Sequence, residues 1–324
     1  MSRLIVIVAL SLLLASHAQA QNPRVWFDLE QGPIILELNA NQAPITTQNF
    51  LGYVNEGFYD GIMFHRIVDG FVVQAGGFDK NFVFRPPTQP TIASERNNGL
   101  ANLRGTIAMA LRAGNLDSAT SQFYINTVYN DFLDEDFTVF GEVVFGMSVI
   151  DEMEQLGTGN RFIDGNNFGN VPMSPPLIRR AAQVQGDGFP IMPQHNGSWY
   201  DANNSGVGFN IEIARGPQGE NGGQLLVYWY DFRAGEPYWM LGLGAYQYGD
   251  TEISLNLFSW DGVSGAADFL SPPPGEAYVT VGQLSLRFED CSSGQLDYQL
   301  DEFGSGSIDL SRITLPEGTR CEGL

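Results

Sequence analysis

The sequence is poor in the residues that most often carry metal or covalent chemistry. Its 324 residues include two cysteines, three histidines and one lysine. One histidine, His17, lies in the first 20 residues, which leaves His65 and His195 beyond them. A zinc site would need carboxylates with at most two histidines, and a serine or cysteine nucleophile would need one of these histidines as its base. We therefore expect a function without metal, cofactor or covalent catalysis.

Positive charge is also scarce. Sixteen basic residues face 37 acidic ones, and the formal net charge is −21. Nucleic-acid binding depends on cationic contacts to the phosphate backbone, so we expect no nucleic-acid partner. The acidic residues are spread over both halves of the chain, which favours a role in solubility over a dedicated acidic binding surface.

Long apolar runs are absent except near the N-terminus. Leu4 to Ala15 is apolar apart from Ser11, and Ala18-Gln19-Ala20 follows it. This pattern is typical of a secretory signal peptide cut after Ala20, since a membrane-spanning helix needs about 20 apolar residues. We expect a periplasmic or secreted protein that is not inserted in the membrane after cleavage. A membrane anchor is the less favoured alternative.

Cys291 and Cys321 are the two cysteines, and both lie near the C-terminus. In an exported protein a disulfide between them is the default expectation. The alternative is a pair of buried thiols.

The length predicts two domains. Signals of strands, with helices at 44–55 and 148–156, fill residues 21–185, and residues 157–176 have a loop-like Gly/Asn/Pro composition. Residues 186–196 contain two glycines and two prolines and are predicted as a linker. Residues 197–324 have alternating strands and no convincing helix, which predicts an all-β accessory domain, a sandwich or small barrel, of unknown function.

Three segments in register carry the most specific signal. They are FHRIVDGFVVQAGG at 64–77, NGLANLRGTIAMA at 98–110 and SATSQFYIN at 118–126, followed by Phe132-Leu133-Asp134 and Val139-Phe140-Gly141. In order and spacing they resemble the cyclophilin family of peptidyl-prolyl cis/trans isomerases, over about residues 24–185. The resemblance implies a mainly β fold, an eight-stranded closed β-barrel capped by two helices. It also implies an enzyme that accelerates rotation about X-Pro bonds.

The resemblance assigns roles to particular residues. Arg66 would be the catalytic cation, Gln74 would orient it, and Phe71 would contact the proline. The remaining expected contacts form the substrate site. Phe71, Met109, Tyr124 and Leu133 would line the proline pocket with Phe132 at its rim and Phe137 in its wall, while Ala110, Leu111 and Gln122 would hold the peptide, largely through backbone hydrogen bonds.

Several of these positions depart from the usual family pattern. Tyr124 stands where many members have Phe, Phe132 where eukaryotic members have Trp, Phe137 where many have His and Leu111 where many have Asn. The departures keep a second hypothesis open, a catalytically weak module that binds proline peptides as an adaptor. In both cases the expected partners are unfolded or flexible proline-containing polypeptides, and we expect a monomer.

Overall fold

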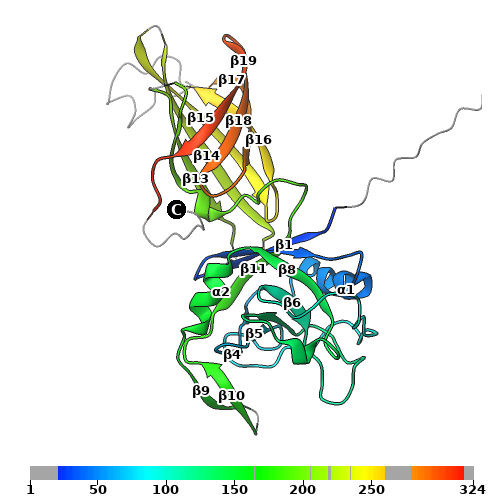
Figure 1. The fold of residues 1–324 in the computed structure, drawn as a ribbon. Coiled ribbons are helices and arrows are strands. Elements are labelled where there is room, and N and C mark those ends of the chain that lie inside the picture. Colours follow the sequence, from blue (N-terminus) through cyan, green and yellow to red (C-terminus); the bar gives the residue numbers. More distant parts are fainter. Residues whose placement is uncertain are drawn as a thin grey trace, which may run out of the picture.

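The chain folds into two β units joined by a short segment (Figure 1). The structure, a computed structural model, describes residues 21–163, 165–204, 206–217, 220–233, 235–259 and 279–316. The predicted signal peptide and Cys321 lie outside these ranges. Within them, no helix is long and apolar enough to cross a membrane.

The N-terminal unit is a curled sheet of nine strands with two α-helices, an additional hairpin and one turn of 3-10 helix. Its elements are β1 (Arg24–Leu29), β2 (Pro33–Leu38), α1 (Pro44–Asn55), β3 (Ile62–Met63), β4 (Arg66–Val68), β5 (Val72–Ala75), β6 (Thr106–Met109), β7 (Phe123–Asn126), the 3-10 helix Asp131–Leu133, β8 (Val139–Phe145), α2 (Met147–Glu154), β9 (Thr158–Ile163), β10 (Asn166–Pro172) and β11 (Leu177–Gln183).

Both predicted helices are present. Pro44 occupies the first turn of α1, where its missing N–H costs no hydrogen bond. The helix ends at Asn55, and Gly57 follows with a φ of +70°, a conformation that favours glycine. The second helix, α2, begins at Met147 and ends at Glu154, slightly earlier than the predicted 148–156.

The sheet has one more strand than the eight expected. Its order is β3-β11-β1-β2-β8-β6-β7-β5-β4. The segment 62–66 divides at Phe64 and His65, which lie between β3 and β4. Its first part pairs with β11 and its second part with β5. The two ends of the curled sheet are therefore joined by two residues of chain.

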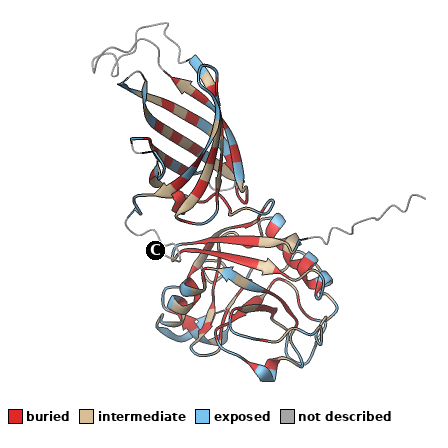
Figure 2. Ribbon diagram, turned by 45° about the horizontal axis from the view of Figure 1, so that its top comes forward, coloured by how far each residue is buried: buried red, intermediate tan, exposed pale blue. Residues whose placement is uncertain are grey.

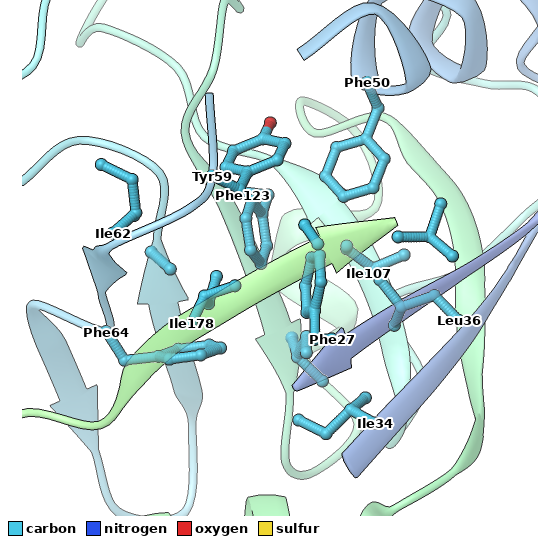
Figure 3. Packing of buried hydrophobic residues seen from close by; sticks show 14 of the residues in the cluster. Phe27, Ile34, Leu36, Phe50, Tyr59, Ile62, Phe64, Ile107, Phe123 and Ile178 are labelled. Atoms are coloured by element: carbon cyan, nitrogen blue, oxygen red, sulfur yellow. The ribbon is translucent and has the colours of Figure 1, made fainter. Parts of the chain in front are cut away.

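An aromatic and aliphatic core fills the inside of this sheet (Figure 3). Phe27, Phe50 and Phe123 are fully buried, and the Phe50 ring meets Phe123 edge-to-face at 5.4 Å between centroids. Phe50 comes from α1, so the helix is held against the sheet by the same cluster. Burial of each such ring contributes roughly 1.5–3 kcal/mol to stability.

The prediction of a loop over residues 157–176 was wrong. This segment contains β9 and β10, an antiparallel hairpin that extends from the side of the domain away from the C-terminal unit (Figure 1). Ile163 and Phe168 anchor it against Met63 and Phe78. The strands could not be predicted from the polar, glycine-rich composition, because this hairpin buries few of its side chains and so has no alternating apolar pattern.

The C-terminal unit is a closed barrel of eight antiparallel strands. β12 pairs with both β13 and β19, which closes the ring. Buried residues alternate with more exposed ones along the strands, visible as alternating bands in Figure 2. The buried side chains form the core of the barrel. The strands are β12 (Gly197–Asp201), β13 (Gly208–Arg215), β14 (Gly222–Arg233), β15 (Glu236–Gln247), β16 (Glu252–Ser259), β17 (Val279–Phe288), β18 (Ser293–Leu300) and β19 (Gly304–Arg312).

Residues 186–196, predicted as a linker, pack closely against the barrel. Ile191 and Met192 are fully buried, and a 3-10 helix spans Pro193–His195. The imidazole of His195 is buried and stacks on the Phe288 ring at 3.7 Å between centroids. This desolvation lowers the pKa of His195 to about 3, so the side chain is neutral. Cys291 lies buried nearby, while its predicted pairing with Cys321 stays a prediction.

The outer face of β1 contacts the barrel. Trp26 is fully buried and its ring lies 5.9 Å from that of Tyr248. Asp28, also fully buried, accepts two hydrogen bonds from Arg215 of β13, at 2.8 Å from Nε and 3.1 Å from the second nitrogen. Desolvation alone would lower the pKa of Arg215, but the hydrogen bonds and charge of Asp28 outweigh it and raise that pKa. The two units therefore share one apolar interface with a bidentate ion pair in it.

We expect Arg215→Leu to lower the free energy of unfolding by about 3 kcal/mol, because it leaves the Asp28 carboxylate buried without its partner. Urea unfolding measures the change. Asp28→Leu combined with Arg215→Leu should recover most of the loss. As a matched control, Arg287→Leu breaks the half-exposed Arg287–Asp297 pair and should cost less than about 1 kcal/mol. Equal losses in the two single variants would contradict the prediction.

Candidate active site

Arg66 and Gln74 lie opposite each other on neighbouring strands. They form a register pair between β4 and β5, so their side chains share one face of the sheet. The Arg66 guanidinium donates to Gln74 Oε1 at 3.4 Å. Partial burial lowers the pKa of Arg66, but a guanidinium stays protonated at neutral pH. Within the described residues Arg66 forms no ion pair, so its remaining N–H groups are available to a ligand.

Gln122 extends this contact by one residue. Gln74 donates from Nε2 to Gln122 Oε1 at 3.1 Å. Gln74 is therefore held on both sides, by Arg66 and by Gln122. This chain of hydrogen bonds holds the side of the guanidinium that faces Gln74, and the orienting role of Gln74 stays a prediction.

Phe71 lies in the turn between β4 and β5, next to the guanidinium. The Arg66 Cζ atom is 5.7 Å from the centre of the Phe71 ring. Phe132, which is 67% exposed, stacks against Phe71 at 5.7 Å between ring centroids and an interplanar angle of 19°. Phe132 is thus exposed and in contact with Phe71, and its place at the rim of a proline pocket stays a prediction.

Tyr124 is buried and its added hydroxyl has a partner. The hydroxyl donates to Asn102 Oδ1 at 2.8 Å, and Asn126 donates to the same oxygen at 3.2 Å. Asn102 in turn donates from its backbone and side-chain nitrogens to Asp134. Burial, and then the negative charge of Asp134, raise the pKa of Tyr124 well above its ordinary value, so it acts as a hydrogen-bond donor. Sequence reasoning missed these partners, although Asn102 and Asn126 stand inside the matched segments.

Beside Tyr124 an apolar cluster contains Val72 and Leu133, with Phe71 and Phe137 packed against it. Phe137 meets the Tyr124 ring edge-to-face at 5.8 Å. The expected pocket residues Phe71, Tyr124, Leu133 and Phe137 are therefore brought together by the fold. An apolar wall beside a cation suits a pyrrolidine ring.

Met109 does not belong to this cluster. It pairs in register with Phe123, and both side chains are fully buried in the core on the opposite face of the sheet. Val72 takes the place that we predicted for Met109. Because side chains two apart on a strand share a face, the position of Gln74 could have identified Val72.

Ala110 and Leu111 follow β6 and are both partly buried. The backbone N–H of Ala110 donates to Gln122 O at 2.9 Å. That group is therefore occupied by the chain itself. A contact to a peptide through Leu111 or through the Ala110 carbonyl stays a prediction.

The β9–β10 hairpin forms one wall of a groove beside Arg66. The cavity, about 470 Å³, is lined on the sheet side by Arg66, Gln74 and Gln122. Arg112 lines it as well, and Phe168 contributes from the hairpin. The sequence pattern did not predict this groove beside the cation.

His65 also lines the groove, but it is 7% exposed. Desolvation lowers its pKa to about 4, and the charge of Arg66 adds to that effect. His65 is therefore neutral at physiological pH. Within the described ranges, no group of three or more His, Cys, Asp or Glu side chains is placed to hold a metal ion.

The comparisons with known proteins agree with this geometry. The family model for cyclophilin type peptidyl-prolyl cis-trans isomerases matches residues 24–181. A peptidyl-prolyl cis-trans isomerase A of Dickeya dadantii is 40% identical over 190 residues, which cover 57% of this chain and 97% of that protein. The chain belongs to the cyclophilin family. It is therefore an isomerase of the peptidyl-prolyl cis-trans class, with an additional C-terminal barrel.

Two further similar proteins also align with about half of this chain and with nearly all of their own length. A peptidyl-prolyl cis-trans isomerase of Acinetobacter baylyi is 42% identical over 183 residues, or 55% of this chain and 94% of that protein. A solved cyclophilin of Cryptosporidium parvum, in the presence of the dipeptide Ala-Pro, aligns with a TM-score of 0.43 at 20% identity, over 50% of this chain and 99% of that one. The two bacterial alignments are shorter than this chain, which continues into the barrel.

We expect Tyr124→Phe to lower the free energy of unfolding by about 1 kcal/mol, the net contribution of one buried hydrogen bond. The loss stays small because Asn126 still donates to Asn102 Oδ1. Urea unfolding measures it, with Tyr230→Phe on the half-exposed barrel surface as the control. A loss below about 0.3 kcal/mol would show that the hydroxyl contributes little to the network.

Proposed function

We propose that this cyclophilin accelerates the cis/trans isomerisation of X-Pro bonds in exported polypeptides, with Arg66 as the catalytic residue. The observation that carries the proposal is the Arg66–Gln74–Gln122 hydrogen-bond chain beside an apolar cluster. It combines an oriented cation with an apolar wall, the two features that this reaction needs.

The physical demand of the reaction fits a cation of this kind. Rotation about an X-Pro bond has a barrier of about 18–20 kcal/mol because amide resonance must be lost. In the twisted state the proline nitrogen becomes pyramidal, and its lone pair is no longer delocalised into the carbonyl. An Arg66 N–H aimed at that lone pair would bind the twisted amide better than either planar form, which lowers the barrier without making or breaking a covalent bond.

The apolar side chains would bind the proline ring and exclude water from it. Phe71, Val72, Tyr124 and Leu133 supply this wall, with Phe132 at the rim. The neighbouring groove would hold the flanking residues of a flexible chain. The substrates would be unfolded or flexible proline-containing polypeptides, which supports a role in protein folding.

The proposed setting follows from the sequence of the first 20 residues. A signal peptide cut after Ala20 would deliver a monomeric protein to the periplasm or the medium, where the Cys291–Cys321 disulfide could form. The alternative function is an adaptor that binds proline peptides with little turnover.

We expect Arg66→Ala to lower kcat/KM for a short X-Pro peptide by at least about ten-fold, or about 1.4 kcal/mol of transition-state stabilisation. Arg66→Lys keeps the charge but loses the planar fork, so an intermediate rate is expected. A protease-coupled isomerisation assay measures the rates, and peptide titration measures binding separately. If the wild-type protein binds the peptide but does not accelerate exchange, the adaptor function replaces the enzymatic one.

The rate should also be nearly independent of pH. Because the pKa of His65 is lowered to about 4 and Arg66 stays protonated, neither group changes charge between about pH 5.5 and 8. We expect kcat/KM for an uncharged peptide to vary by less than about two-fold over that range. A step centred near the ordinary histidine pKa of about 6.5 would mean that a titrating histidine takes part.

A further inference from the structure

A cleft between the two units collects much of the scarce positive charge. It has a volume of about 420 Å³ and combines residues of the cyclophilin unit with residues of the barrel. Five of the sixteen basic residues of a chain with net charge −21 line it. We call it the interdomain cleft and define it by Lys80, Arg85, Arg179, Arg180, Arg215 and Tyr248.

Part of this charge is not balanced by the protein. The acidic residues that line the interdomain cleft are Asp60 and Asp79. Asp60 pairs with Arg180 at 3.4 Å, and the buried Asp28 pairs with Arg215 at 2.8 Å. Lys80 is exposed and, within the described residues, forms no ion pair. Arg179 lies 3.9 Å from Glu30, and both side chains are well exposed, so that pair contributes little. The positive charge that is open to a ligand therefore lies at Lys80 and Arg179.

Other cations of the interdomain cleft are held in place by the fold. Arg85 donates to the backbone oxygens of Phe58 and Asp60, at 2.6 and 2.9 Å. Arg215 is fixed by the buried carboxylate of Asp28. Positions fixed in this way need no ordering when a ligand binds, which favours binding.

Two polar atoms at the interdomain cleft have no hydrogen-bond partner in the described part of the chain. They are the hydroxyl of Tyr248 and Nε of Arg180. Tyr248 is only 5% exposed. The Arg180 guanidinium lies over the Tyr248 ring, 5.6 Å from its centre. Leaving a buried donor unsatisfied costs about 1–3 kcal/mol, so such a group calls for a partner.

We propose that the interdomain cleft binds a small ligand through an oxyanion, a carboxylate or phosphate group. Lys80, Nε of Arg180 and the Tyr248 hydroxyl donate to it, and Arg179 adds positive charge. Guanidinium and ammonium groups suit such oxygens because their hydrogen bonds to an anion are charge-assisted. The ligand would contact both units at once. This site is separate from the groove beside Arg66 and does not depend on the isomerase mechanism.

The single lysine of the chain makes the site directly measurable. Lys80 and the N-terminal amine are the two primary amines, so an amine-selective acylating reagent reports on Lys80 at one peptide by mass spectrometry. Inorganic phosphate and citrate serve as separate probes, with sodium chloride at equal ionic strength as reference. At about ten times Kd, a bound probe should slow acylation of Lys80 by about ten-fold and leave the N-terminal amine unchanged.

Matched variants connect the protection to the interdomain cleft. Tyr248→Phe removes the unpartnered hydroxyl but keeps the ring beside Trp26, so the fold should persist and phosphate or citrate affinity should fall several-fold by calorimetry. Arg96→Gln removes one positive charge outside the cleft and should leave the affinity unchanged. Protection by citrate alone would identify a carboxylate ligand, and protection by phosphate alone a phosphate ligand.

Three results would overturn the proposal. They are an absence of protection by both probes, equal protection by chloride, and an affinity that does not change in Tyr248→Phe. Isomerase activity is measured in the same samples. A loss of activity in Arg66→Ala with intact probe binding would separate the two sites.

Discussion

The alternation of side chains across β5, β6 and β7 is the constraint on which the active site depends. Gln74 and Ala108 both lie opposite Tyr124 and share its face, whereas Val73, Phe123 and the other alternate residues point into the core. The period is two, so a slip of one residue would exchange the aromatic core with the substrate-facing side chains. The burial of Phe123 therefore fixes the register that sets Gln74 opposite Tyr124, while the β4–β5 pairing sets Gln74 opposite Arg66.

Local signals predicted what lies within one element. Pro44 and Gly57 bound α1, and the short spacing from Arg66 through the turn to Gln74 placed both in one hairpin. The prediction that Met109 lines the proline pocket was wrong for a different reason. A matched segment gives the order of residues but not the face of the sheet, which is decided by the pairing of β6 with β7. Val72 was missed for the same reason.

Features that depend on distant segments could not be predicted from the sequence. Asp28 alternates with apolar residues in β1, a pattern that indicates exposure, yet a barrel residue 187 positions later buries it. The β9–β10 hairpin has the composition of a loop, and its strands form because each supplies the other's hydrogen bonds while Phe168 packs against Phe78. The composition of the barrel predicted its strands, but not the face of the cyclophilin unit that it covers.

The position of β1 between two cores has a consequence for the order of synthesis. Its inner face is buried by the cyclophilin core and its outer face by the barrel, whose strands leave the ribosome long after it. Until then Trp26, Ile35 and the Asp28 carboxylate remain in contact with water. A shortened chain that ended after β11 would keep an apolar patch with a lone acid in it, a surface prone to association. The barrel thus shields the outer face of β1 from water.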